Sequence, residues 1–232
     1  MKIKLSAFLL LAVFAAAKFN PVAAQNVQSK WLVGLGWSFV DDDGKIAPSF
    51  SNLMFVPYPS TVHGGRYLGH GVTVDASVCY SKYSNGKIVN GVEAINVGNG
   101  NNLYFSFDLM LKYDLHEFYY QLHKRPEARK DEADANRKKQ FMDYFDPYIL
   151  FGYGYTYRAY YANIAGSPTN NFGLGFNVWI KSFIGINLQA MGKFRMMDKV
   201  SNHVLYTAGI VYRFPRGEGQ AGEGSKKVNM KF

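Results

Sequence analysis

The chain has 232 residues, a formal net charge of +9 and a single cysteine, Cys79. One cysteine cannot form an internal disulfide, so a disulfide-stapled scaffold is excluded. The mean hydropathy is −0.16, and no apolar run beyond Ala17 is long enough for a membrane helix, so a bundle of membrane helices is excluded too.

The first 24 residues have the layout of a secretory signal peptide. Met1–Lys4 is basic, Leu5–Ala17 is apolar, and Val22-Ala23-Ala24 supplies small residues for cleavage. An uncleaved anchor is the alternative, but the apolar run is shorter than the ~20 residues that a membrane helix needs. An exported chain argues against a nucleic-acid partner, and anionic lipid head groups explain the basic charge equally well.

Eight later segments alternate large apolar side chains with Gly, Ser, Asn, Thr and a few charges. In the first, Val33, Leu35 and Trp37 share one parity, whereas Gly34 and Gly36 occupy the other. A period of two residues is typical of strands. The predicted strands are Trp31–Val40, Ser60–Leu68, Val72–Lys82, Leu103–Asp114, Pro147–Arg158, Asn171–Ile180, Ile184–Phe194 and His203–Phe214. The second is the least regular of the eight.

One parity carries too many large apolar side chains, and the other carries too many glycines, for the two faces of the strands in a soluble β-sandwich. Strands of about ten residues, tilted near 45°, span the roughly 25 Å apolar band of an outer membrane. Lipid offers no hydrogen bonds, so such a sheet must close on itself. The sequence therefore predicts that residues 25–214 form an all-β, eight-stranded antiparallel up-and-down transmembrane β-barrel in the outer membrane of a Gram-negative bacterium.

The connections between strands suggest an orientation. The turns at Gly69–Gly71 and Lys181–Phe183 are short, as periplasmic turns are, and the loops after the first and third strands are long. Both termini are therefore expected in the periplasm, and residues 215–232 are expected to form a flexible tail there. Asp41-Asp42-Asp43-Gly44 lacks the glutamate that a calcium loop needs at its twelfth position, so it is interpreted as an acidic extracellular loop.

The connection over residues 115–146 does not fit this scheme, because it is long and highly charged on the periplasmic side. Its central part favours helix, with Pro126 suited to a first turn. It is either a solvated excursion or a docking element for an outer-membrane or periplasmic protein. The candidate docking residues are Lys124, Arg125, Arg129, Lys130, Arg137, Lys138 and Lys139.

Charged residues on the inward parity predict a polar network in the lumen. They are Asp75, Asp108, Lys112 and Arg213, with Asp114 and Lys193 nearer the mouths. Buried charges need partners, so ion pairs are expected among them. A structural plug is favoured over proton or ion conduction, because eight strands enclose little more than their own side chains.

Three other kinds of chemistry are weighed against this plug. The five histidines fall on different elements without a metal-binding spacing, so neither a metal site nor a cofactor is expected. Ser60, His63 and Asp75 offer the residue types of an acyl-transfer or lipid-hydrolysing enzyme, but no motif singles them out. A small-solute porin would need a wider lumen.

Several short motifs, taken in order, resemble the barrel domain of OmpA-like outer-membrane proteins of the Bacteroidota type. They are Gly34-Leu35-Gly36 with Val40-Asp41-Asp42, Pro59 with Gly65-Arg66-Tyr67-Leu68, Tyr104-Phe105-Ser106-Phe107-Asp108, Phe145-Asp146-Pro147-Tyr148 with Gly152-Tyr153-Gly154-Tyr155-Thr156, Gly173-Leu174-Gly175-Phe176-Asn177, and Gly209-Ile210-Val211-Tyr212-Arg213-Phe214. Such proteins often continue into a peptidoglycan-binding domain, which this chain is expected to lack. The resemblance implies a non-enzymatic barrel with a structural or accessory-subunit role, for example in an outer-membrane assembly or secretion complex.

Overall fold

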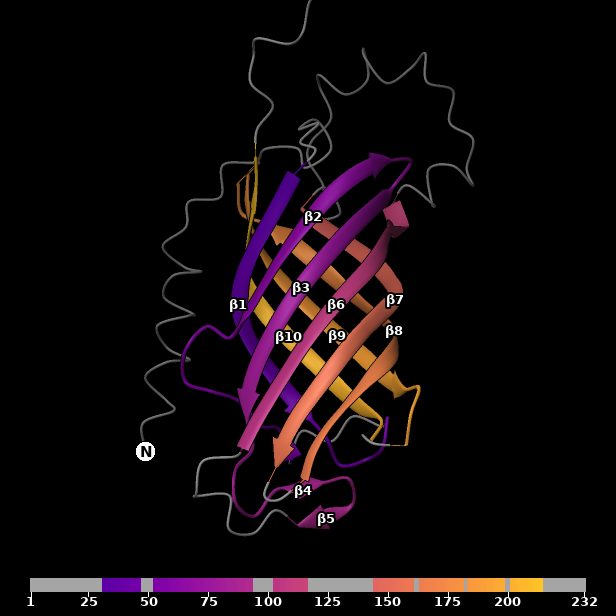
Figure 1. The fold of residues 1–232 in the computed structure, drawn as a ribbon. Coiled ribbons are helices and arrows are strands. Elements are labelled where there is room, and N and C mark those ends of the chain that lie inside the picture. Colours follow the sequence, from indigo (N-terminus) through magenta and orange to yellow (C-terminus); the bar gives the residue numbers. More distant parts are fainter. Residues whose placement is uncertain are drawn as a thin grey trace, which may run out of the picture.

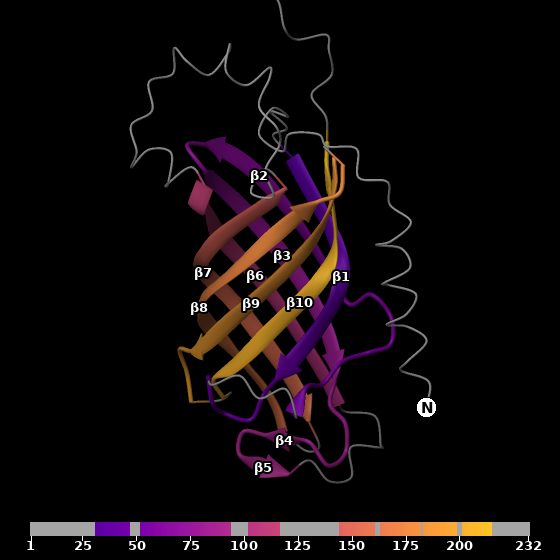
Figure 2. The same cartoon turned by 180° about the vertical axis from the view of Figure 1, so that it is seen from behind.

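The computed structural model describes residues 31–46, 52–93, 102–116, 144–160, 163–181, 183–198 and 201–214. Within them, eight long strands close into an antiparallel barrel in the order β1-β10-β9-β8-β7-β6-β3-β2 (Figures 1 and 2). The strands are β1 (Trp31–Asp41), β2 (Thr61–Gly69), β3 (Val72–Lys82), β6 (Asn102–Asp114), β7 (Phe145–Tyr160), β8 (Asn163–Trp179), β9 (Ile184–Arg195) and β10 (His203–Arg213). The predicted eight-stranded barrel is confirmed.

Two strands are longer than their sequence pattern indicates. β7 begins at Phe145, inside the segment interpreted as the charged connection, and β8 begins at Asn163 rather than at Asn171. Alternation fails early in β8, where Gly166 and Pro168 interrupt it. Proline is tolerated there because the ladder between β8 and β9 starts only at Thr169, so Pro168 needs no ladder donor on that side.

A small hairpin in the connection after β3 was not predicted. It consists of β4 (Ile88–Val89) and β5 (Val92–Glu93). The two turn residues, Asn90 and Gly91, have φ angles of 52° and 78°. Two positive φ angles are the requirement of a tight type I′ hairpin turn, and Asn-Gly is its strongest signal.

The two ends of the barrel differ. The termini-side mouth holds Trp31, the turn Gly69-His70-Gly71 and the ends of β6, β8 and β10. All three residues of that turn have positive φ, including 51° at His70. The loop-side mouth lies at the opposite end, where Figure 1 shows β4 and β5.

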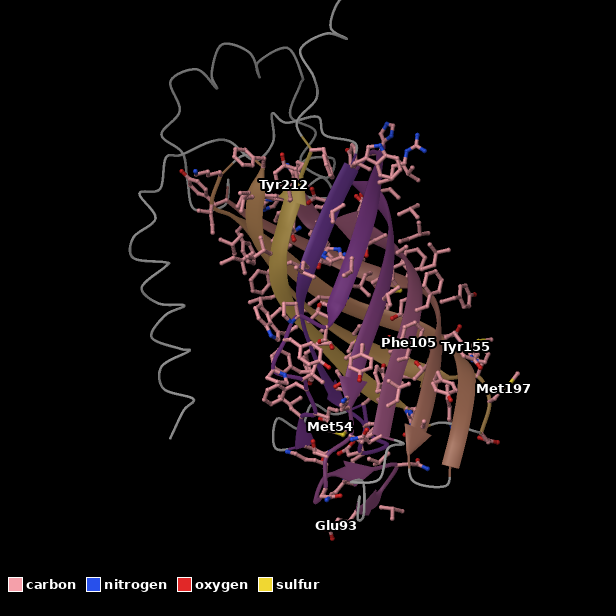
Figure 3. The ribbon with its side chains drawn as sticks, turned by 60° about the vertical axis from the view of Figure 1, so that its left-hand side comes forward. Met54, Glu93, Phe105, Tyr155, Met197 and Tyr212 are labelled. Carbon is pink, nitrogen blue, oxygen red and sulfur yellow. The ribbon has the colours of Figure 1, made fainter. Side chains whose placement is uncertain are left out.

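The facing of the side chains matches the predicted alternation. Phe107, Phe151 and Ile210 are 48, 50 and 59% exposed on the outer surface. Figure 3 shows Phe105, Tyr155 and Tyr212 pointing away from the wall. A continuous exposed apolar belt of this kind is what a lipid-facing surface requires. Among the described residues, no helix is long and apolar enough to cross a membrane.

β2 is too short to complete the wall at the loop-side mouth. Its ladder with β1 stops at Gly36 and Thr61, whereas β1 continues to Asp41. Residues 52–60 fill the gap: Val40 and Met54 exchange backbone hydrogen bonds of 2.9 Å, and the Ser60 amide donates to the Gly36 carbonyl at 2.7 Å. Backbone groups that β2 leaves without a ladder are thus satisfied.

Candidate functional site: the filled lumen and its two mouths

A group of buried polar side chains closes the loop-side mouth, and we call it the loop-side cluster: Asp42, Tyr83, Arg158, Ser201 and His203. The Asp42 carboxylate lies 2.8 Å from the Arg158 guanidinium and accepts hydrogen bonds from Ser201 Oγ (2.6 Å) and Tyr83 Oη (2.8 Å). Arg158 also donates to Ser201 Oγ and to the Ser201 carbonyl, at 2.7 and 2.9 Å. One carboxylate therefore joins the segments that follow β1 and β3 to β7 and to the segment before β10.

Burial dominates the electrostatics of this carboxylate. Asp42 is fully buried, and desolvation raises its pKa from 3.8 to about 6, although Arg158 and the hydroxyls of Ser201 and Tyr83 lower it. Burial also holds the pKa of Tyr83 well above its usual value. A carboxyl with a pKa this high changes charge within the mildly acidic range.

Two of the three aspartates in the acidic loop predicted at residues 41–44 are buried rather than presented on the surface. Asp41 and Asp42 are both fully buried, and Asp41 accepts a hydrogen bond from Asn52 at 3.3 Å. Asp43 is partly exposed and accepts a bond from the Lys45 amide at 2.8 Å. Alternation cannot show that a loop folds inward, because the loop's direction depends on partners that are remote in the sequence.

A second group, the central cluster, lies around Asp108. This residue pairs with Lys193, which is fully buried, and it accepts hydrogen bonds from Asn171 at 2.7 Å and Ser106 at 3.2 Å. Lys193 was expected nearer a mouth, and its backbone does lie close to the loop-side end of β9, where it is paired with His203. Its side chain reaches across the lumen from β9 to Asp108 on β6, two strands that are not neighbours in the wall.

A third group lies towards the termini-side mouth. Asp75 is 3.1 Å from both Lys112 and His63, and Lys112 lies 5.0 Å from the centre of the Tyr148 ring. The predicted neighbours Asp75 and Lys112 are thus in contact. Arg213 is placed separately, 3.8 Å from the Trp179 ring centre and 3.8 Å from Asp146. The four predicted lumen charges are therefore divided among separate groups.

Glycine is required where a side chain crosses the lumen close to the wall. A Cβ at Gly34 would collide with the His63 ring, and a Cβ at Gly154 would collide with the Asp108 carboxylate. The glycines on the inward parity thus make room for the polar groups that fill the barrel.

The structure brings together only two of the three candidate acyl-transfer residues. His63 contacts Asp75, as a base and its orienting acid would. Ser60 is engaged elsewhere: its Oγ lies 2.7 Å from Ser38 Oγ and accepts the Ser38 amide at 3.0 Å. The structure thus pairs two of the three groups, and it places the hydroxyl in the wall beside β1.

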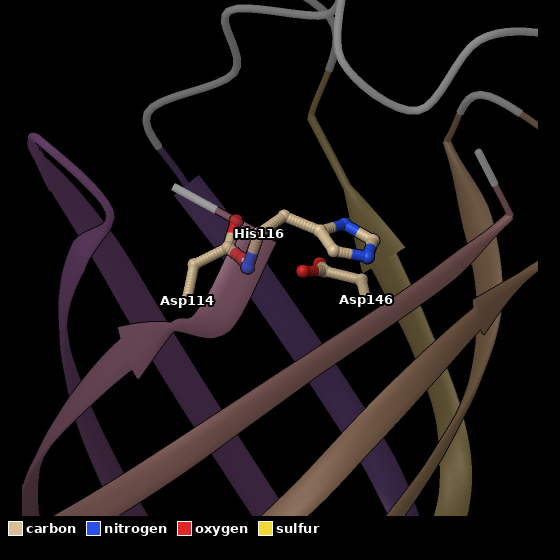
Figure 4. A group of neighbouring side chains, drawn as sticks. All are labelled: Asp114, His116 and Asp146. Atoms are coloured by element: carbon tan, nitrogen blue, oxygen red, sulfur yellow. The ribbon is translucent and has the colours of Figure 1, made fainter. Parts of the chain in front are cut away.

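Three potential metal ligands meet at the termini-side mouth. One ligand atom from each of Asp114, His116 and Asp146 lies within 4.8 Å of the others (Figure 4). Spacing motifs missed this group because its members flank the long connection. The usable signal was the pairing of β6 with β7, which brings both ends of that connection together. The predicted signal peptide and the predicted tail lie outside the described residues. So do the candidate docking residues, which are Lys124, Arg125, Arg129, Lys130, Arg137, Lys138 and Lys139.

No family model and no curated protein matches the chain. Among solved structures, it is similar to the outer-membrane protein OprG of Pseudomonas aeruginosa at 11% identity, over 84% of this chain and all of that one, with a TM-score of 0.49. Neisserial surface protein A is 10% identical over 79% of this chain and 97% of its own, with a TM-score of 0.48. Ail of Yersinia pestis, solved with the heparin analogue sucrose octasulfate, is 13% identical over 80% and 97%, with a TM-score of 0.41.

Proposed function

We propose that this chain is a non-enzymatic outer-membrane barrel that serves as a structural or accessory subunit of a membrane-protein complex. The observation that supports this most is the combination of an apolar outer belt with a lumen occupied by paired charges. The belt suits insertion into lipid, and the charges fill the space through which a solute would pass. A barrel of this kind holds its loops and connections at the two membrane surfaces.

The filled lumen is tested by conductance. Purified protein reconstituted into planar bilayers should give no current steps of porin size, since the central and loop-side clusters block the path. Steps of that size in wild-type protein would reject the plugged barrel and favour the porin alternative. Lipid hydrolysis or acyl transfer by the purified protein, abolished in His63→Ala, would favour the enzyme instead.

We assign the termini-side mouth to the periplasm and the loop-side mouth to the cell exterior. Two of the termini-side connections are short turns, which supports this orientation. Cys79 is buried and does not interfere with labelling of engineered cysteines. A membrane-impermeant maleimide should label Val92→Cys, on the β4–β5 hairpin, in intact cells. It should label Lys181→Cys, on a termini-side turn, only after the cells are opened; the reverse pattern would overturn the orientation.

The charged connection is the proposed docking element for a periplasmic or membrane-protein partner. Affinity purification in mild detergent, followed by mass spectrometry, tests it. Replacing its seven candidate basic residues by glutamine should remove co-purifying envelope proteins. A matched variant that neutralises Glu127, Asp131, Glu132 and Asp134 of the same segment should retain them. An unchanged set of co-purifying proteins in the first variant would leave the segment as a solvated excursion.

A further inference from the structure

We propose that Asp114, His116 and Asp146 form a binding site for one divalent transition-metal ion, of the zinc class, at the termini-side mouth. Asp114 is the last residue of β6 and His116 lies two residues beyond it, whereas Asp146 is the second residue of β7. Figure 4 shows the three side chains converging, with the His116 ring beside the Asp146 carboxylate. This site is separate from the proposed accessory role and does not depend on it.

The donor set fits this class of ion. One ligand atom from each residue lies within 4.8 Å of the others. Zinc–nitrogen and zinc–oxygen bonds are about 2.0–2.2 Å, so donors on one ion lie roughly 3.5 Å apart. A shift of about 1 Å in these partly exposed side chains therefore brings all three onto one ion. An imidazole with two carboxylates suits zinc or cobalt better than calcium, which prefers oxygen ligands throughout.

The histidine supplies an independent reason to expect a ligand. His116 Nε2 is buried and has no hydrogen-bond partner among the described residues. A buried ring nitrogen without a partner is costly, and neutral imidazole nitrogen is the commonest metal ligand in proteins. A bound cation would satisfy this atom.

The carboxylates are already oriented by neighbouring groups, as outer-shell hydrogen bonds orient metal ligands. The His116 amide donates to Asp114 Oδ1 at 2.7 Å. Trp179 Nε1 donates to Asp146 Oδ2 at 3.3 Å, and the Arg213 guanidinium lies 3.8 Å from the same oxygen. Both contacts with Asp146 use Oδ2, so Oδ1 serves as the ligand atom.

Arg213 also sets the strength of the site. Its positive charge opposes a second cation near Asp146, and the Trp179 ring holds it in place at 3.8 Å. The site should therefore bind metal more weakly than the same three ligands would without the arginine. Because His116 and Asp146 flank the long connection, metal binding would fasten its two ends together.

The experiment uses the full chain, produced without a polyhistidine tag, folded in detergent micelles and stripped of metal. Cobalt is titrated and followed by its visible absorption, and zinc is then added as a competitor. Wild-type protein should bind one equivalent of cobalt that zinc displaces. His116→Asn should weaken binding by about 100-fold or more, since it removes a direct ligand.

His70→Asn is the matched control. His70 is an exposed histidine at the same mouth, and asparagine tolerates its positive φ. This variant should bind cobalt like the wild type. Arg213→Gln should bind about tenfold more tightly, because a unit charge a few ångströms from the ion is removed. Equal binding in wild-type protein and His116→Asn, or no binding by wild-type protein, overturns the proposal.

A measurement on the unaltered protein covers the case in which His116→Asn does not fold. Nuclear magnetic resonance of the histidine rings in detergent micelles reads each histidine separately and does not need an accessible nitrogen. Zinc should shift the ring signals of His116 and leave those of His70 unchanged. Unchanged His116 ring signals on addition of zinc would refute the site.

Discussion

The two mouths of the barrel are closed in different ways. At the loop-side mouth, Asp42 and Arg158 are buried together and are held by hydroxyls from two further segments. At the termini-side mouth, Arg213 and Asp146 keep 16 and 20% of their side chains exposed and lie 3.8 Å apart. The first arrangement is a sealed lid made by several chain segments; the second is a loose pair that water reaches. Stability should therefore depend on the loop-side charges, and ligand access should be greater at the termini-side mouth.

The largest expected effect comes from breaking the loop-side ion pair. Arg158→Met leaves the Asp42 carboxylate buried without its cation, which should lower the free energy of unfolding by about 3–5 kcal/mol. Arg213→Met, at the termini-side mouth, should cost only about 1 kcal/mol or less, because water screens its pair. Urea unfolding in phospholipid vesicles measures both. Equal losses in the two variants would remove the distinction between the mouths.

The pH dependence of stability sharpens the same distinction. The Asp42 carboxyl titrates near 3.8 when unfolded and near 6 in the folded protein. The folded state therefore binds the proton more tightly, so wild-type protein should gain stability relative to Asp42→Asn as the pH falls from about 6 to 4. The gain should be on the order of 2 kcal/mol, at about 1.4 kcal/mol for each pKa unit.

The check is a set of urea midpoints for both proteins across that pH range. A gap between wild-type protein and Asp42→Asn that stays constant would mean that Asp42 is hydrated rather than buried. A gap that widens towards neutral pH in favour of the wild type would mean that the ion pair with Arg158 outweighs desolvation.

A third prediction, with a smaller effect than the loop-side ion pair, concerns the space that Gly34 leaves for His63. Gly34→Ala should cost about 1–2 kcal/mol, because the added methyl group collides with the imidazole. In a His63→Ala background the same substitution should cost much less. A double-mutant cycle in vesicles gives the coupling, and additive costs would place the His63 ring away from Gly34.

The sequence predicts the strands of the barrel wall better than it predicts the contacts between side chains inside the lumen. Alternation places Phe107 outward and Asp108 inward without knowledge of any neighbour, because successive side chains of a strand face opposite ways. It does not reveal that Asp108 pairs with Lys193. That choice depends on how strand tilt and stagger bring β6 opposite β9, which no single strand encodes.

The mouths were the hardest to predict for a related reason. Asp42 is buried because Arg158 pairs with its carboxylate and Ser201 donates a hydrogen bond to it, and both residues lie far from Asp42 in the sequence. Two features near the mouths could have been predicted from the sequence. Asn90-Gly91 is a dipeptide typical of a tight hairpin turn. The proximity of Asp114 and Asp146 follows once β6 is paired with β7.

The ladder between β1 and β10 joins residues from the two ends of the barrel sequence, from Leu32 with Arg213 to Asp41 with Val204. Until β10 arrives, any shorter sheet presents two rows of unpaired amide and carbonyl groups to hydrocarbon, where nothing can satisfy them. An incomplete sheet is therefore unstable in the bilayer. Among the described strands, the wall closes only when β10 pairs with β1, so a polypeptide cut short before His203 should be cleared by proteases rather than persist as a smaller pore.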